Sequence, residues 1–292
     1  MKTNILKGKE VVKKINDKLI IKIDELNENN IVPGLAAILI GSDPASKVYI
    51  RSKEKAFAKL SCYTKTFTFT EDRTENEIIE LIEKLNNDDE FHGILVQLPL
   101  PEKFNTRKIL HTINPSKDVD GLHPFNLGLL FEGNPSYIPC TPNGIIEILK
   151  YYKISTLGKH AVIIGRSNIV GKPMFALLSQ NFEWGNSTVT ICHTKTKNLK
   201  EITLKADILI AAVGVPNFVE GSMVKEGVEI IDVGINRVLD DSDKGYKLVG
   251  DVNFKSMIGK AKSITPVPGG VGPLTIRMLI RNTVNAAFKS LD

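Results

Sequence analysis

The order of apolar and polar residues along the chain predicts alternating helices and strands. Helical spacing over residues 5–30 is followed by an unbroken apolar run at 35–40, which ends at Gly41. Such a run, stopped by a glycine, indicates a buried strand. The pattern then predicts two helices and two strands, namely helices at 46–60 and 74–86 and strands at 64–69 and 93–98. Strands separated by helices favour a parallel sheet covered by helices.

The pattern changes between residues 114 and 142, where proline, glycine and asparagine are frequent. We expect an irregular segment there, and long irregular segments in compact proteins are often functional. After a helix at about 143–153, a second alternation predicts four strands, at 160–164, 188–192, 207–213 and 229–233. The C-terminal segment opens with a Gly/Pro turn and continues as an amphipathic helix that we expect to pack back on the first domain.

A chain of 292 residues is long for a single compact core, so two domains are expected. We place the first domain at 1–142, completed by the C-terminal helix at 273–292, and the second at 143–272. The fold class is therefore α/β, with two α/β domains, of which the second has the pattern of a Rossmann-type domain.

Composition narrows the class of protein. Hydrophobic residues make up 42% and charged residues 24%, which is typical of globular proteins. The amino terminus has no uninterrupted apolar core of the kind that signal peptides carry, and no apolar run reaches the length of a membrane span. Cys62, Cys140 and Cys192 are widely spaced and form no C-x-x-C pair, so we expect a reducing compartment and a cytoplasmic protein.

The net charge of +5 has no pattern typical of nucleic-acid binding, because the lysines are spread over predicted helices and no basic run is interleaved with aromatic residues. Such a charge suits anionic small molecules. The histidines show no H-x-x-x-H spacing and the cysteines are unpaired, so no metal site is expected.

The stretch HAVIIGRSNIVGKP predicts a strand, a glycine turn and the start of a helix. Backbone amides at a helix start, together with the positive end of the helix dipole, can bind a pyrophosphate. The spacing of Gly165, Ser167 and Gly171 meets the G-x-G-x-x-G pattern only in part. A tight turn without a ligand therefore stays open as an alternative.

The end of the next strand, ICHTKTK, bears on which dinucleotide would bind. Domains that select NAD usually carry a carboxylate there, which binds the ribose 2'-hydroxyl. Here His193, Thr194, Lys195 and Lys197 offer a hydroxyl and cations, and Arg166 adds a guanidinium suited to a phosphate. The sequence favours NADP over NAD.

Three polar residues of the first domain are candidates for a small-molecule site. Tyr49 and Lys53 lie four residues apart, on one face of a predicted helix, although most such pairs are solvated helix surface. Gln97 follows an apolar strand in GILVQLPLP, at the carboxyl edge where α/β sites form, and a polar strand end is the alternative.

Several motifs, taken in order, resemble the methylenetetrahydrofolate dehydrogenase/cyclohydrolase family over about residues 5–289. They are YIRSK, GILVQLPLP, SKDVDGLHPFNLG, GRSNIVGKP, TVTICHTKT, DVGINR and PVPGGVGPLT. The resemblance implies a folate-binding catalytic domain and a Rossmann-type NADP domain with the active cleft between them. It also implies a homodimer.

The resemblance further implies roles for single residues. Lys53 would be the catalytic lysine, and Tyr49 would lie against the folate or hydrogen-bond to it. Gln97 would orient and electrically tune the lysine, and Asp120 would hold the pterin ring. A carboxylate suits a pterin because it accepts two hydrogen bonds from the ring, although Asp120 could also be a turn former in DVDG, a role that Asp118 fits better. The implied substrate-binding residues are Val96, Leu98, Pro268, Gly269, Gly270, Val271 and Gly272. The implied cofactor-binding residues are Gly165, Arg166, Ser167, Thr190, Thr194 and Ile235. Thr194 stands where many members have serine, and it keeps the hydroxyl.

The activity so implied is oxidation of 5,10-methylenetetrahydrofolate with NADP, followed by hydrolysis to 10-formyltetrahydrofolate, a step of one-carbon metabolism that serves purine biosynthesis. A lysine at its reference pKa of about 10.4 is a poor base, so burial or a cationic substrate would have to favour the neutral amine of Lys53. Two alternatives stay open: another two-domain NAD(P) dehydrogenase, acting on amino or hydroxy acids, and a non-enzymatic nucleotide sensor.

Overall fold

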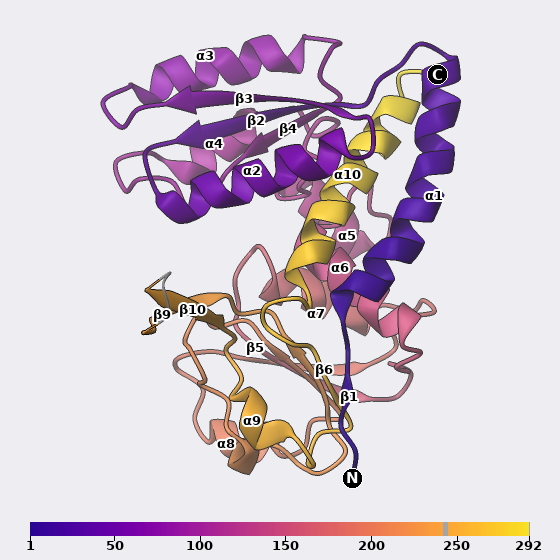
Figure 1. The fold of residues 1–292 in the computed structure, drawn as a ribbon, viewed down its shortest axis with the longest axis vertical. Coiled ribbons are helices and arrows are strands. Elements are labelled where there is room, and N and C mark those ends of the chain that lie inside the picture. The colour runs from indigo at the N-terminus through magenta and orange to yellow at the C-terminus, as the bar shows by residue number, and fades with distance from the viewer. Residues whose placement is uncertain (242–244, 292) are drawn as a thin grey trace. The chain divides into compact units, whose positions relative to one another are not determined.

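A computed structural model describes residues 1–241 and 245–291 of the chain (Figure 1). The chain forms two compact units. Unit 1 consists of Met1–Lys13 and Thr141–Thr275, and unit 2 of Lys14–Cys140 and Ile276–Asp292. The first domain expected from the sequence included residues 1–13. They belong to unit 1 because strand β1 (Asn4–Ile5) pairs in parallel with β11 (Ser263–Ile264).

Unit 2 is built around a three-stranded parallel sheet in the order β3-β2-β4. The strands are β2 (Gly34–Ile40), β3 (Tyr63–Phe69) and β4 (Gly93–Val96). Every residue of the central strand β2 is buried, as expected of a parallel strand covered on both faces. The predicted α/β class is confirmed for this unit.

Helices α2 (Pro44–Ala58) and α3 (Glu75–Asn86) lie alongside these strands (Figure 1). Asp43 caps α2, because its side chain accepts a hydrogen bond of 2.7 Å from the amide of Ser46, and Pro44 takes the first helical position. This cap sets the start of α2, and with it the helix turns on which Tyr49 and Lys53 lie.

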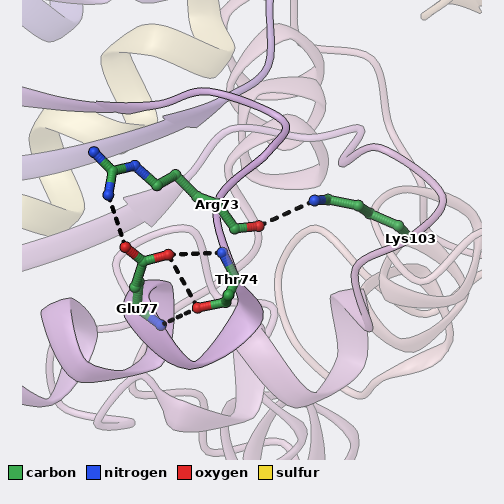
Figure 2. A network of polar contacts seen from close by, with 4 residues as sticks. All are labelled: Arg73, Thr74, Glu77 and Lys103. Carbon is green, nitrogen blue, oxygen red and sulfur yellow. Dashed lines mark hydrogen bonds and ion pairs between the residues drawn. The ribbon is translucent and has the colours of Figure 1, made fainter.

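Helix α3 begins with a reciprocal cap, shown in Figure 2. The amide of Thr74 donates to Glu77 Oε2 at 2.7 Å, and the amide of Glu77 donates to Thr74 Oγ1 at 3.3 Å. Arg73 pairs with Glu77, and Lys103 donates to the carbonyl of Arg73. The network ties the loop before α4 (Thr106–Thr112) to the start of α3.

The segment expected to be irregular at 114–142 contains a helix, α5 (Pro124–Glu132). The expectation was wrong there because the prolines and glycines mark the helix ends. His123 caps α5 through Nδ1, which accepts the amide of Phe125 at 3.1 Å, and Pro124 takes the first helical position. Gly133, with a φ of 94°, ends the helix.

Unit 1 contains a six-stranded parallel sheet in the order β1-β11-β8-β7-β5-β6. Its four longer strands are β5 (His160–Ile164), β6 (Thr188–Cys192), β7 (Ile208–Ala211) and β8 (Glu229–Asp232). Their apolar residues form a core with Val219, Val224 and Met257. All pairings in this sheet are parallel, which confirms the α/β class for unit 1 as well.

The helices of unit 1 include α6 (Cys140–Tyr151), of which Cys140 belongs to unit 2, together with α7 (Gly171–Ser179), α8 (Leu199–Thr203) and α9 (Phe254–Met257). A short 3-10 helix lies at Gly221–Met223. An antiparallel hairpin of β9 (Asn236–Leu239) and β10 (Tyr246–Val249) was not predicted. Its strands have only four residues each, too few for a clear alternating pattern.

Two long helices, α1 (Gly8–Glu28) and α10 (Gly272–Phe288), each contribute residues to both units. From Ile276 onward α10 belongs to unit 2. There, Asn282 donates from Nδ2 to the carbonyls of Val119 and Ile138, at 2.8 and 3.2 Å. The prediction that the C-terminal helix packs on the first domain is confirmed.

Candidate active site

A buried lysine and a glutamine form the centre of the candidate site in unit 2. Lys53 is only 6% exposed and donates from Nζ to Gln97 Oε1 at 3.0 Å. Gln97 follows strand β4, and its own Nε2 donates to the carbonyl of Leu98 at 2.8 Å. This second bond holds the amide so that its oxygen faces the lysine.

The surroundings of Lys53 favour the neutral amine. Burial lowers the pKa of Lys53, and the electrostatic attraction of Asp120 and Cys140 opposes this effect in part. The Nζ atom also lies 4.6 Å from the centre of the Tyr49 ring, one helical turn earlier on α2. The structure therefore brings Tyr49, Lys53, Gln97 and Asp120 together within one unit.

Asp118 shapes the turn that carries Asp120. Its carboxylate accepts the amides of Leu122 and His123, at 3.2 and 2.7 Å, and the side-chain amide of Asn126 at 2.8 Å. The expectation that Asp118 is the turn former is confirmed. Burial raises the pKa of Asp118, and these three hydrogen bonds counteract that rise.

Cys140 and Asn282 are parts of this region that sequence reasoning missed. Burial and Asp120 raise the pKa of the Cys140 thiol well above its usual value, so the thiol is protonated. Its Sγ donates to the carbonyl of Val119 at 3.5 Å, the same carbonyl that Asn282 binds. These contacts hold the backbone next to Asp120. No local pattern revealed them, because Asn282 is 163 residues from Val119 along the chain.

Two of the substrate candidates in unit 2 differ in their surroundings. Val96 is buried in the hydrophobic core with Ile38 and Ile94, so its side chain contacts apolar neighbours. Leu98 is half-buried, and its carbonyl is the acceptor that holds the Gln97 amide. The structure thus gives Leu98 a direct contact with the Lys53–Gln97 pair and gives Val96 a packing role.

In unit 1, two glycines at the loop between β5 and α7 allow neighbouring backbone segments to lie very close to it. Gly165 has a φ of +124°, and a side chain there would collide with the carbonyl of Ala212. A side chain at Gly171, the first residue of α7, would collide with the carbonyl of Gly165. Ser167 Oγ accepts the amide of Val170 at 3.1 Å, which satisfies one donor at the helix start.

Four of the residues that offer a hydroxyl or a cation to a 2'-phosphate are accessible. Arg166, Thr194, Lys195 and Lys197 are all exposed, and the turn after β6 is held by a bond from the amide of Lys195 to His193 Nδ1 at 3.1 Å. A glycine cradle next to a helix start, with exposed cations at the end of the adjacent strand, fits an NADP molecule.

Thr190 and Ile235 lie in different settings. The Thr190 hydroxyl is hydrogen-bonded to His160 Nε2 at 2.9 Å, so it already has a partner within the sheet. Ile235 is 56% exposed between β8 and β9. A Cβ placed on Gly272 would lie 3.4 Å from Ile235 Cδ1, so a cofactor candidate and a substrate candidate are neighbours in unit 1.

The candidate segment from Pro268 to Gly272 packs against the start of α1. The amide of Gly8 donates to the carbonyl of Gly269 at 2.8 Å. A side chain at Gly8 would collide with the carbonyl of Gly270, which explains a glycine at that position. Val271 is buried.

Among residues 1–241 and 245–291, no group of three or more His, Cys, Asp or Glu side chains is arranged to hold a metal ion. In the same part of the chain, no helix has the length and apolar character needed to cross a membrane.

The fold and the site together define a two-domain α/β dehydrogenase, with a dinucleotide-binding sheet in one unit and a buried lysine in the other. Two family models match the chain. The model of the tetrahydrofolate dehydrogenase/cyclohydrolase catalytic domain matches residues 6–120, and that of the NAD(P)-binding domain matches residues 139–291. The chain belongs to the tetrahydrofolate dehydrogenase/cyclohydrolase family.

Known relatives align with this chain over nearly its whole length. The chain is 51% identical to the bifunctional protein FolD of Acetivibrio thermocellus, with 98% of each chain covered, and 50% identical to that of Streptococcus mutans, with 99% of each covered. Among solved structures, it is similar to the bifunctional FolD enzyme of Campylobacter jejuni at a TM-score of 0.92 and 47% identity, over 99% of each chain. It is also similar to the Trypanosoma brucei enzyme, solved with NADP and an inhibitor, at a TM-score of 0.94 and 35% identity, covering 100% of this chain and 99% of that one.

Family membership makes the chain a bifunctional enzyme of one-carbon folate interconversion, with methylenetetrahydrofolate dehydrogenase and methenyltetrahydrofolate cyclohydrolase activities. The prediction of this family and of these activities is confirmed. The alternatives of an amino-acid or hydroxy-acid dehydrogenase and of a non-enzymatic nucleotide sensor are not supported.

Proposed function

We propose that Lys53 is the catalytic amine of this enzyme and that the dehydrogenase step uses NADP. The observation that carries the proposal is the buried hydrogen bond between Lys53 and Gln97. Bound NADP would accept a hydrogen with its electron pair from the one-carbon bridge of 5,10-methylenetetrahydrofolate, which leaves the methenyl cation. Arg166, Lys195 and Lys197, all exposed near the glycine cradle, would bind the 2'-phosphate.

In the hydrolysis step, the Lys53 amine would accept a proton from water as the water oxygen bonds to the methenyl carbon. The carbon then carries a hydroxyl group, and the ammonium would return a proton to N5 as the bond between N5 and that carbon breaks. The hydroxyl would release its remaining proton to solvent as the C=O bond forms, which gives 10-formyltetrahydrofolate. Burial supports this role because it lowers the pKa of Lys53, and a cationic substrate would favour the neutral amine further.

Gln97 and Asp120 would position these reactants. A neutral amine has two N–H donors and one lone pair, so a bond to Gln97 Oε1 restricts the directions in which the lone pair can point. Asp120 is partly exposed and interacts electrostatically with Lys53, so its carboxylate is available to accept hydrogen bonds from the pterin ring. Tyr49, whose ring lies near Lys53 Nζ, would pack against the folate.

The test compares the wild-type enzyme with Lys53→Gln, using Lys55→Gln as the matched control. Lys55 is an exposed lysine on the same helix. We expect wild type and Lys55→Gln to form NADPH from methylenetetrahydrofolate and to hydrolyse supplied methenyltetrahydrofolate, both followed by ultraviolet absorbance. Hydrolysis by Lys53→Gln should fall by about 10²-fold or more, the usual contribution of a general base. Unchanged hydrolysis in this variant would contradict the catalytic role of Lys53.

We also propose that the enzyme acts as a homodimer in the cytoplasm and supplies formyl groups to purine biosynthesis. All three cysteines are free and buried, as in proteins of reducing compartments. The homodimer rests on family resemblance. Light scattering on the purified protein tests it, since a mass near 32.2 kDa would indicate a monomer and contradict the proposal.

A further inference from the structure

Two buried carboxylates in unit 1 lie outside the residues considered so far. Asp232 ends strand β8 and Asp251 follows strand β10, and they are 3% and 0% exposed. Neither takes part in an ion pair among the residues that the structure describes. Buried charges without a cationic partner are costly unless hydrogen bonds compensate them, so the donors around this carboxylate pair matter.

Asp251 joins two loops of unit 1. Its Oδ2 atom accepts the amides of Val213 and Gly214, at 2.6 and 3.0 Å, in the loop that follows strand β7. Its Oδ1 atom accepts the side-chain amide of Asn236, the first residue of β9, at 2.9 Å. A single side chain thus links the loop after β7 to the segment after β8.

Asp232 holds the segment that carries Asp251. Its Oδ1 atom accepts the amides of Gly234 and Asp251, at 3.1 and 2.9 Å, and its Oδ2 atom accepts the amide of Val252 at 3.0 Å. The amide of Asp232 donates to Thr265 Oγ1 at 2.7 Å. Burial raises the pKa of Asp232 to about 7, and the three backbone amides oppose this rise because they favour the carboxylate. Three amides that converge on one side chain hold it in a defined position.

The two carboxylates are also interlocked sterically. A side chain at Gly234 would collide with the carboxylate of Asp251, and a side chain at Gly250 would collide with that of Asp232. Asp251 therefore packs against Gly234, two residues after Asp232, and Asp232 packs against Gly250, the residue before Asp251. Ile235 lies between Gly234 and Asn236, so its backbone is held on both sides by this pair.

We propose that Asp251, held in place by Asp232, is a positioning residue for the dinucleotide. Ligands of parallel α/β sheets bind outside the carboxyl ends of the strands, and the loops that Asp251 joins follow two such ends, those of β7 and β8. Fixing Ile235 and the backbone at Val213 and Gly214 sets the surface on which the nicotinamide half would rest. The inference rests on the proposed use of NADP, and it adds residues that do not themselves touch the cofactor.

The hydrolysis activity of the same enzyme is the control for folding, because hydrolysis of added methenyltetrahydrofolate consumes no NADP. In Asp251→Asn, the KM for NADP should rise by about tenfold or more, since misplacing a positioned group by even 1 Å can cost up to 10²-fold. Hydrolysis should stay within about twofold of wild type, a difference that corresponds to less than half of 1 kcal/mol. A general loss of folding would lower both activities together, which separates positioning from mere structural support.

Asp207→Asn is the matched control variant. Asp207 is also a hydrogen-bonded carboxylate of unit 1, and it accepts hydrogen bonds from the amide of His160 and from the ammonium group of Lys225. It lies at the amino ends of β5 and β7, away from the carboxyl ends that Asp251 joins. The Asp207→Asn variant should leave the KM for NADP unchanged. Asn236→Ala removes one hydrogen-bond donor to Asp251, so it should also raise the KM for NADP, by a smaller factor. This variant replaces Asp251→Asn as the test if Asp251→Asn does not fold.

In a folded Asp251→Asn enzyme, equal losses of the two activities or an unchanged KM for NADP would overturn the inference. If Asp251→Asn does not fold, an unchanged KM for NADP in Asn236→Ala would overturn it. The wild-type enzyme is assayed in parallel. If it forms no NADPH, the proposed cofactor is wrong and the inference falls with it. If it forms NADPH while the variants bind NADP normally, only the positioning role is contradicted.

Discussion

Lys53 donates a hydrogen bond of 3.0 Å from Nζ to Oε1 of Gln97, a residue 44 positions further along the chain. The bond joins the middle of helix α2 to the end of strand β4. Because both side chains are buried, the bond forms away from competing water and restricts the orientation of the amine. The protonation and the direction of Lys53 are therefore set by residues distant in sequence.

Gln97→Glu should shift the pH dependence of hydrolysis upward. A carboxylate at this position would stabilise the ammonium form and raise the pKa of Lys53, so a higher pH would be needed to form the neutral amine. The measurement is the rate of methenyltetrahydrofolate hydrolysis as a function of pH. Gln180→Glu, the same change in unit 1, should leave the profile in place. A profile of Gln97→Glu identical to that of wild type would show that Gln97 does not tune the amine.

Lys53→Met should stabilise the protein while abolishing hydrolysis. Burial lowers the pKa of Lys53 from its unfolded value of 10.5, so protons bind preferentially to the unfolded state between the two pKa values. In that window stability rises with pH, and the lysine costs stability as the pH falls toward the folded pKa. A methionine of similar length removes this cost and should raise the free energy of unfolding at neutral pH by about 1 kcal/mol.

Urea unfolding at neutral pH and at pH 9 checks this prediction. The gain of Lys53→Met over wild type should be smaller at the higher pH, because that pH is closer to the unfolded pKa of 10.5 and deprotonating the lysine on folding costs less there. A loss of stability at neutral pH would mean that the hydrogen bond to Gln97 outweighs the cost of burying the amine.

Asn282→Ala should weaken folate binding and destabilise the protein. The change leaves the carbonyls of Val119 and Ile138 without this donor, and such a loss costs about 1–3 kcal/mol. Because Val119 precedes Asp120, the KM for methylenetetrahydrofolate should rise while that for NADP stays constant. Asn285→Ala is the control, since Asn285 lies on the same helix and its side chain accepts a hydrogen bond from Lys22 at the surface. Equal effects of the two substitutions would contradict the role of Asn282.

Arg166→Ala should raise the KM for NADP far more than that for NAD. The exposed guanidinium lies in the glycine loop after β5, and loss of a hydrogen bond to a charged group costs about 1.5–3 kcal/mol, which corresponds to at least about tenfold. Lys159→Ala, an exposed cation just before the other end of β5, should change neither constant. If both cofactors were affected equally, Arg166 would not recognise the 2'-phosphate.

The sequence by itself determined the features that depend on local pattern. The apolar run of β2, the glycine after it and the helix that carries Tyr49 and Lys53 all follow from the spacing of neighbouring residues. The turn role of Asp118 and the glycine loop after β5 were likewise readable, because caps, turns and strand ends are set by interactions within a few positions.

Only the tertiary structure decided the features that depend on contacts between distant segments. The pairing of β1 with β11 moved residues 1–13 into unit 1, and a residue of α10 turned out to hold the carbonyl next to Asp120. The same holds for the neutral tendency of Lys53 and for the interlocked Asp232 and Asp251. Burial sets the protonation tendency of Lys53, and hydrogen bonds over long separations hold the two aspartates in place. Neither effect is present in any short stretch of the chain.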